Sequence, residues 1–173
     1  MEKSELRPDI ELKDPNIHGS VFIASGAKVI GDVTVSEDSS IWYNAVCRGD
    51  IQEIKVGKRT NLQDGVIIHL ENDLGCYIGD DVTAGHGAIL HACTIEDGCL
   101  IGMGAIILNG AIIKKGAVIG AGAVVKENTI VPENSLAVGI PAKVIKTTEG
   151  QYEQNVKWAS KYVKLAQVHK EKG

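Results

Sequence analysis

Three of the five histidines in this 173-residue chain have a spacing that could bring them to one divalent metal ion. Three neutral imidazoles and one open position form the ligand set of a catalytic zinc site, with zinc–nitrogen distances of about 2.0–2.1 Å. The chemistry of such a site is the activation of water at neutral pH. The candidate ligands are His69, His86 and His91, and the remaining histidines, His18 and His169, are predicted to be surface residues.

A six-residue repeat over most of the chain would position these side chains. Between residues 95 and 136, every sixth residue is Ile or Val, a small residue or Cys follows four positions later, and Gly is frequent at the second position. The same register continues back to Ile17 with short interruptions. This pattern predicts a triangular parallel β-helix, an all-β solenoid in which three hexads form one coil. About twenty hexads then give between six and seven coils.

The repeat gives way to a helical pattern after Lys143. The apolar residues that follow alternate in steps of four and three, which indicates an amphipathic helix, and Gly150 is the expected entry turn. We therefore predict a hexapeptide β-helix with a short N-terminal lead-in at residues 1–148. A C-terminal α-helix and tail at residues 149–173 belong to the same domain. The predicted stripe is Tyr152, Val156, Ala159, Val163 and Ala166.

The repeat register places the histidines on two faces of the prism. His69 and His91 take the second position of hexads on one face, one coil apart, and Arg48 takes the same position one coil earlier. His86 lies on an adjacent face together with Asp64. The outward normals of two faces of a triangle diverge by roughly 120°, so His86 cannot reach the other two histidines of its own chain.

A neighbouring chain can supply the third histidine. If three prisms stand parallel around a threefold axis, His86 of one chain lies between the levels of His69 and His91 of the next. By the same count, Asp64 lies between the levels of Arg48 and His69. The spacing thus predicts a three-histidine site at each subunit interface, supported by an ion pair between Arg48 and Asp64. The alternative is that outward histidines only line a polar oligomer interface.

Several polar residues beside this column are candidates for supporting roles. Gln63 would hydrogen-bond a metal-bound water or the substrate, or would be a plain polar interface residue. Asn61 would either support the site through a hydrogen bond or stabilise a corner in an asparagine ladder. Asp50 follows Arg48 by two residues and would orient its guanidinium.

Composition excludes several other classes of function. The net charge is −4 and there is no run of Lys or Arg, which argues against nucleic-acid binding. No apolar stretch approaches the ~20 residues of a membrane span. The charged beginning of the chain lacks the apolar core of a secretory signal, so a cytoplasmic location is expected. The four cysteines show no paired CxxC spacing and are predicted to be reduced thiols.

These motifs resemble the gamma-class carbonic anhydrases and their bacterial relatives over roughly residues 10 to 170. The resemblance implies a left-handed β-helix, a homotrimer, and one divalent metal per interface, zinc first and iron(II) or cobalt(II) as alternatives. It also implies that Arg48, Asp50 and Asp64 form interface ion pairs and that Gln63 orients water. The motifs are Arg48-Gly49-Asp50, Asn61-Leu-Gln-Asp-Gly65, His69, Gly85-His86-Gly87, His91 and Gly139-Ile-Pro-Ala-Lys143.

One departure from the family pattern concerns proton transfer. The archaeal archetype has Glu directly after Arg-Gly-Asp, where this chain has Ile51, and a longer acidic loop than Leu70–Leu74. Glu71 or Asp73 would then be the proton shuttle. The resemblance implies a lyase in which a metal-bound hydroxide hydrates CO2 to bicarbonate reversibly. The alternatives are a hexapeptide acyltransferase, an acyl-CoA thioesterase using the same metal site, and a non-catalytic trimeric metal-binding scaffold.

Overall fold

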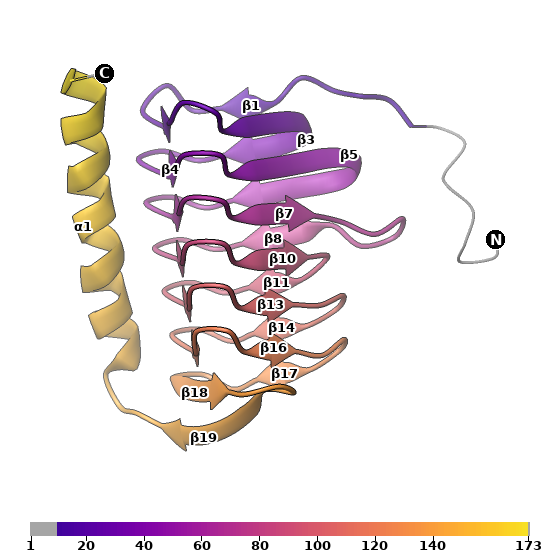
Figure 1. Cartoon of the computed structure of the whole chain (residues 1–173), viewed down its shortest axis with the longest axis vertical. Coiled ribbons are helices and arrows are strands. Elements are labelled where there is room, and N and C mark those ends of the chain that lie inside the picture. Colours follow the sequence, from indigo (N-terminus) through magenta and orange to yellow (C-terminus); the bar gives the residue numbers. More distant parts are fainter. Residues whose placement is uncertain (1–9, 173) are drawn as a thin grey trace.

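The computed structural model describes residues 10–172, which form a parallel β-solenoid of about seven turns with one long helix along its side (Figure 1). The predicted β-helix of hexapeptide repeats with a C-terminal helix is confirmed, and the architecture agrees with the left-handed form that the resemblance implies. The first nine residues of the predicted lead-in, 1–9, and the tail residue 173 lie outside the described residues.

The strands belong to two sheets that together make the three faces of the prism. The first sheet covers two faces, because its long strands β3 and β5 pass from one face to the next. It contains β1 (Asn16–Ile17), β3 (Lys28–Val35), β5 (Val46–Val56), β7 (Ile67–His69), β8 (Cys76–Ile78), β10 (Ile89–His91), β11 (Thr94–Ile95), β13 (Ile106–Ile107), β14 (Ile112–Ile113), β16 (Val124–Val125) and β17 (Ile130–Val131).

The second sheet forms the face against which the helix packs. All its neighbouring strands are parallel except the last pair, in which the final strand turns back on its neighbour. It contains β2 (Phe22–Ile23), β4 (Ser40–Ile41), β6 (Asn61–Leu62), β9 (Thr83–Ala84), β12 (Leu100–Ile101), β15 (Val118–Ile119), β18 (Ser135–Val138) and β19 (Lys143–Thr147).

The first residue of almost every hexad points into the prism and packs on the equivalent residue one coil away. These inward residues form one continuous core in which most side chains are fully buried, and small residues fill the space below each corner. The register pairs Ile68 with Leu90 and Leu90 with Ile107, which confirms the predicted faces. An exception is Ile23, which is 41% exposed at the open end of the solenoid, where no further coil covers it.

The long strands are a difference from the predicted scheme of one short strand and one corner per hexad. β3 and β5 run through a corner, and their glycines Gly31 and Gly49 stack at the bend. A Cβ atom on Gly31 would lie 2.2 Å from the Gly49 carbonyl oxygen, and Gly31 has φ +80°. Two backbones that approach this closely leave no room for a side chain, so the bend requires glycine.

The helix α1 (Gln151–Lys172) packs along the second sheet, but its buried stripe is rotated from the predicted one. The buried residues are Asn155, Ala159 and Ala166, whereas Val156 and Val163 are only half-buried. Asn155 is polar and is therefore missed by a search for apolar spacing. Its amide donates to the carbonyl oxygens of Gly98 at 2.8 Å and of Gly116 at 3.1 Å, which anchors the helix to two coils.

The C-terminal part of the chain contains two features that the sequence analysis did not anticipate. β19 pairs antiparallel with β18 and covers the last open edge of the second sheet, an edge that would otherwise offer unpaired backbone groups. His169, predicted to be a surface residue, is half-buried instead. Its ring lies 5.0 Å from that of Trp42 and its Nδ1 lies 3.0 Å from the Tyr43 hydroxyl. The helix extends to Lys172, so His169 is still on its packed face.

Candidate functional site

His69 and His91 meet on the outside of the first sheet. They end the adjacent strands β7 and β10 and are paired directly in the register. The Nδ1 atom of His69 lies 3.2 Å from the Nε2 atom of His91, and both side chains are half-buried. Neighbouring parallel strands hold equivalent residues about 4.8 Å apart, so the repeat itself stacks the two rings. The column predicted from the hexad register is therefore present.

In each ring, the nitrogen that points away from the other histidine, here called the outer nitrogen, hydrogen-bonds an oxygen atom. His69 Nε2 lies 3.0 Å from Asp50 Oδ1, and His91 Nδ1 lies 2.6 Å from Asn109 Oδ1. Carboxylate and amide oxygens can only accept hydrogen bonds, so each ring donates from its outer nitrogen. In rings that carry their only proton on the outer nitrogen, the inner nitrogens, His69 Nδ1 and His91 Nε2, have lone pairs that face each other. Two acceptors at this distance repel unless a proton or a cation lies between them.

Asp50 and Arg48 form an ion pair at the upper end of this column. Burial raises the pKa of Asp50, but hydrogen bonds from His69 and Arg48 outweigh that effect and hold it below its usual value. Asp50 is therefore a carboxylate at neutral pH and accepts from both neighbours. Desolvation lowers the pKa of His69, and its hydrogen bond to Asp50 opposes this shift. The pair thus favours a neutral His69 ring, the form that binds metals.

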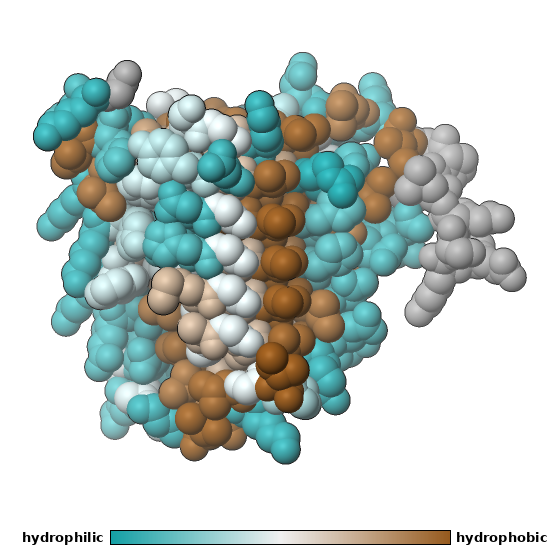
Figure 2. All heavy atoms as spheres, viewed as in Figure 1, coloured by the Kyte–Doolittle hydropathy of each residue, from teal (hydrophilic) through white to brown (hydrophobic). Residues whose placement is uncertain are grey.

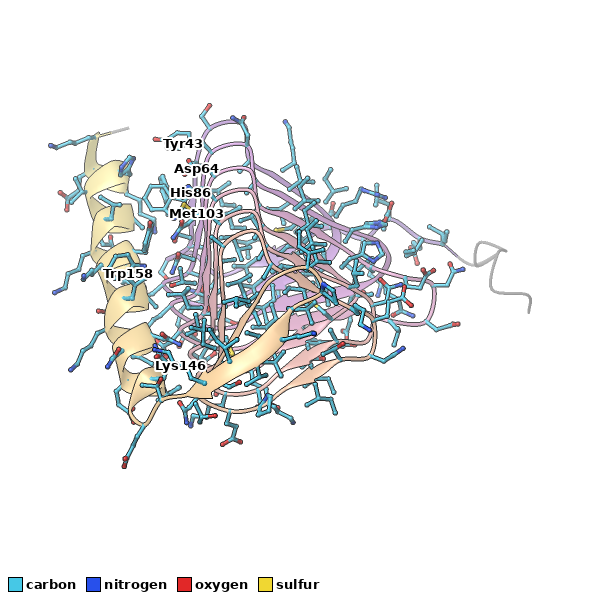
Figure 3. All side chains as sticks on the ribbon, turned by 60° about the horizontal axis from the view of Figure 1, so that its bottom comes forward. Tyr43, Asp64, His86, Met103, Lys146 and Trp158 are labelled. Atoms are coloured by element: carbon cyan, nitrogen blue, oxygen red, sulfur yellow. The ribbon has the colours of Figure 1, made fainter. Side chains whose placement is uncertain are left out.

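His86 lies in a turn at a corner of the prism, apart from the face that carries His69 and His91. It occupies a column of turn residues beside the helix, with Asp64 one coil before and Met103 one coil after (Figure 3). His86 Nδ1 lies 2.7 Å from Asp64 Oδ2, and both side chains are almost half exposed. Within residues 10–172, no group of three or more His, Cys, Asp or Glu side chains could hold a metal ion. One chain therefore brings together two of the predicted ligands.

Gln63 and Asn61 are buried beside the helix rather than beside His69. The Gln63 amide donates to Asn61 Oδ1 at 3.1 Å, and the Asn61 amide donates to Thr83 Oγ1 at 2.9 Å. Asn61 thereby fixes Gln63 and one corner of the second sheet at the same time. Both predicted roles of Asn61 are thus compatible with one set of contacts.

Glu71 lies in the short loop that follows β7. The loop closes on itself through backbone hydrogen bonds between Glu71 and Leu74. One carboxylate oxygen of Glu71 accepts from the Asn72 backbone at 2.9 Å, and the other accepts from the Asn109 amide at 3.4 Å. The predicted shuttle residue is therefore connected to His91 through one side chain. Asp73, the other predicted candidate, lies in the same loop.

Three residues near the histidines were missed by the sequence analysis. Asn109 lies one coil below His91, and an asparagine at a turn is also explained by backbone conformation alone. Tyr162 and Trp158 of α1 line an apolar cavity of about 350 Å³ that has His86 and Gln63 at its edge. Burial raises the pKa of Tyr162, the charge of Asp64 adds to that effect, and a hydrogen bond with Gln63 opposes it. Helical spacing from the buried Asn155 would have identified Tyr162.

The cysteines take no part in this site. All four are buried and free, as predicted, and Cys76 and Cys93 stack inside the prism with their sulfur atoms 3.9 Å apart. Burial raises the pKa of Cys47 and of Cys99 to about 12. No helix among the described residues is long and apolar enough to cross a membrane.

Comparison with known proteins gives two kinds of similarity. Residues 92–127 match the model of the bacterial transferase hexapeptide (six repeats) family. The chain is 48% identical over 153 residues to a protein of Methanocaldococcus jannaschii named "Probable carbonic anhydrase", covering 88% of this chain and 96% of that one. It is 46% identical over 91 residues to the mitochondrial gamma carbonic anhydrase 2 of Arabidopsis thaliana, covering 49% of this chain and 33% of that longer protein.

A solved structure is similar over nearly the whole length. It is a hexapeptide transferase family protein from Anaplasma phagocytophilum, with a TM-score of 0.84 and 38% sequence identity. The match covers 88% of this chain and 91% of the other. The names of these relatives therefore include both anhydrases and transferases on one fold.

Proposed function

The chain belongs to the gamma carbonic anhydrase-like family of hexapeptide-repeat proteins, and from this premise we propose that it is a metal-dependent lyase that hydrates CO2 reversibly between the subunits of a homotrimer. The observation that carries this proposal is the contact between His69 and His91. Their inner nitrogens lie 3.2 Å apart, and two acceptor nitrogens are stable at this distance when a proton or a cation lies between them.

The donor chemistry of this pair fits a divalent metal. Two nitrogens bound to one tetrahedral zinc ion at about 2.0–2.1 Å are separated by about 3.3 Å, close to the observed contact. His69 and His91 would each bind through the inner nitrogen, while Asp50 and Asn109 hold the outer ones. Imidazole ligands suit zinc, iron and cobalt alike, so the donor set supports a divalent ion without selecting one.

The third ligand is proposed to be His86 of a neighbouring chain. Its Nδ1 is bonded to Asp64, which leaves Nε2 available, and the side chain is 47% exposed. The adjacent strand face supports such contact between chains. Ile67, Ile89, Ile106 and Val124 form an apolar stripe along β7, β10, β13 and β16, and Ile67 is 44% exposed (Figure 2). A neighbouring prism would bury this stripe.

The ion pair between Arg48 and Asp64 of two chains remains part of the proposal. Arg48 is 46% exposed and bonds Asp50 on one side only, and Asp64 is 44% exposed. Asp50 would hold the guanidinium toward the partner's carboxylate. We also propose that residues 1–148 and 149–173 form one domain, supported by the two hydrogen bonds of Asn155 to the solenoid.

The chemistry that a divalent ion supplies is the acidification of water to a pKa near ~7, which makes hydroxide available to attack CO2 at neutral pH. The chain contributes orientation and proton removal. Gln63, held by Asn61, would direct its carbonyl oxygen to the reacting water at the interface. Glu71 would accept the released proton at its carboxylate, which Asn109 holds beside the histidine pair. Because hydration releases one proton per turnover, this acceptor would limit the rate.

A second candidate function is acyl transfer or thioester hydrolysis. The apolar cavity between α1 and the second sheet has His86 at its edge, and Asp64 orients the His86 ring. A histidine held by a carboxylate beside an apolar cavity could act as a general base on an acyl substrate. This arrangement would function without a metal, which separates it from the anhydrase. A trimeric scaffold would bind metal and catalyse nothing.

Metal content of three proteins tests the proposal. The native chain, His86→Ala and His18→Ala would be purified without added metal and analysed for metal and for mass in solution. His18 is a matched control because it is exposed and its ring nitrogen Nδ1 hydrogen-bonds Ser20. We expect about one divalent ion per subunit in the native trimer and in the control, and its loss in His86→Ala.

CO2 hydration by stopped-flow assay then separates the functions. Hydration by the metal-loaded native trimer that disappears in His86→Ala supports the anhydrase. A native trimer that binds metal but does not hydrate CO2 would support the non-catalytic scaffold. Turnover of an acyl thioester after chelation, combined with no bound metal in any of the three proteins, would replace the anhydrase with the metal-free reaction.

A further inference from the structure

Asn109 makes the shortest hydrogen bond to either of the paired histidines. Its Oδ1 lies 2.6 Å from His91 Nδ1, and its amide nitrogen lies 3.4 Å from Glu71 Oε2. We propose that Asn109 is a positioning residue that holds the His91 ring with its proton on Nδ1 and its lone pair on Nε2, directed toward His69. This inference rests on the proposed function, because it takes His91 to be a metal ligand.

The orientation of the Asn109 amide follows from its two partners. The Glu71 carboxylate can only accept a hydrogen bond, so it takes the NH2 group, and the carbonyl oxygen is left for His91. The carbonyl then requires a proton on His91 Nδ1. One carboxylate therefore sets the amide, and the amide sets the tautomer of the ring. Without these two hydrogen bonds, a neutral histidine can exchange its proton between the two ring nitrogens.

The fold holds Asn109 in place from both sides. Asn109 and Gly110 form the turn that follows β13, and Gly110 has φ +68°. The Asn109 backbone carbonyl accepts from Asn128 N at 2.9 Å, and Gly110 N donates to the carbonyl of Ala92, the residue after His91, at 2.8 Å. The side chain is therefore presented to His91 by two coils at once. His69 receives the matching restraint from Asp50 one coil above.

Removing the Asn109 carbonyl oxygen should weaken metal binding, an effect that a purely structural role of Asn109 would not produce. Partners that hydrogen-bond the outer nitrogen of a metal-binding histidine typically change metal affinity by 10–100-fold. Asn109→Ala removes the acceptor, whereas Asn109→Asp keeps an oxygen at the same position. Glu127→Ala is the matched control, since Glu127 occupies the turn one coil below Asn109 and is exposed.

The first measurement is the protonation of the His91 ring by nitrogen NMR of the full chain, at about pH 8, above the ordinary histidine pKa of about 6.5. Both chelated and zinc-loaded samples would be recorded. We expect the proton on Nδ1 in the native chain, in Asn109→Asp and in Glu127→Ala, and a mixture of tautomers in chelated Asn109→Ala. A native His91 protonated on Nε2, or a chelated Asn109→Ala whose His91 ring keeps its proton on Nδ1 alone, would overturn the proposal.

The second measurement is the zinc dissociation constant by competition with a chelator. We expect Asn109→Ala to bind zinc 10–100-fold more weakly than the native chain, and Asn109→Asp and Glu127→Ala to stay within about threefold. Equal affinity in Asn109→Ala also overturns the inference. A native chain that binds no divalent metal would instead remove the proposed function, while the ring measurement would still report whether Asn109 fixes His91.

Discussion

The solenoid has two regions that are built from the same repeat but differ in their outward-facing side chains and in the regularity of their coils. Residues 94–131 form regular coils, in which two-residue strands follow one another without insertion. Residues 46–92 contain the bent strand β5, the Glu71 loop and all the paired histidines. The cores of the two regions are equally buried. The irregular region therefore gains its chemistry at little cost to packing, because inward residues keep their register while outward ones vary.

Equivalent outward positions make this comparison concrete. One coil below His91 the column continues with Leu108, and one coil below His86 it continues with Met103. The regular region presents the same backbone register with Leu108 and Met103 at these positions in place of histidine. The backbone thus supplies position, and the substitutions at outward positions supply function.

His91→Ala compared with Lys126→Ala should show the largest difference. Lys126 is exposed and stands two coils below His91 in the same column. A metal ion contributes several kcal/mol of transition-state stabilisation, so its loss should lower the rate of CO2 hydration by about 10³-fold or more. Lys126→Ala should retain native metal content and rate. Metal analysis and stopped-flow hydration measure both. Equal losses in the two variants would contradict this separation of position from function.

Ile113→Ala in the regular region should affect stability instead. Ile113 is fully buried between the coils of Thr94–Ile95 and Ile130–Val131. Removing a buried isoleucine side chain costs about 2–5 kcal/mol. Denaturant unfolding, at a temperature where the variant is folded, should show this decrease in the free energy of unfolding. The folded variant should still bind one metal per subunit. Ile130→Ala is the control, because Ile130 is 59% exposed in the next coil and should cost much less.

A second metal site should appear if the regular coils lack only the ligands. Leu108→His, Lys126→His and Ala121→His together would place a second three-histidine set two coils below His69, His91 and His86, without sharing a ligand with the first set. We expect about two metals per subunit, the second bound 10–100-fold more weakly because nothing equivalent to Asp50 orients it. Each single variant is a control. A metal content that stays at one per subunit would show that the outward positions of the two regions do not have equivalent geometry.

Much of this architecture could be predicted from the sequence because the repeat is one-dimensional. Inward positions recur every six residues, so counting alone placed His69 above His91, and placed His86 in a separate column on an adjacent face. The passage of β5 through a corner was missed, since it depends on the contact of Gly31 with Gly49 in the next coil. Asn155 and Asn109 were missed because their partners are backbone carbonyls and a histidine from other coils. The spacing of residues in the sequence does not predict side-chain contacts between different coils.

The smallest effect concerns pH and a surface bridge of the regular region. Glu96 accepts from Lys114 Nζ at 2.7 Å and from the Lys115 backbone at 3.0 Å, and the Lys114 hydrogen bond outweighs burial to lower the pKa of Glu96. The bridge should therefore stabilise the fold fully above the unfolded-state pKa of about 4.3, and this contribution should be lost as the pH falls through the lower folded-state value. Both side chains are about one-third exposed, so the contribution should stay below about 1 kcal/mol.

Unfolding of the native chain and of Glu96→Gln by denaturant, at several pH values between about 7 and 3, would measure this contribution. The difference in free energy of unfolding should be constant near neutral pH and shrink toward zero at the acid end. Glu127→Gln, a change of the same charge on the same region, should show no such convergence. A Glu96→Gln difference that persists at the acid end would mean that the side chain stabilises the coil through packing and not through its charge. At neutral pH, metal binding by the folded variant should match that of the native chain, because the bridge belongs to the region that supplies only position.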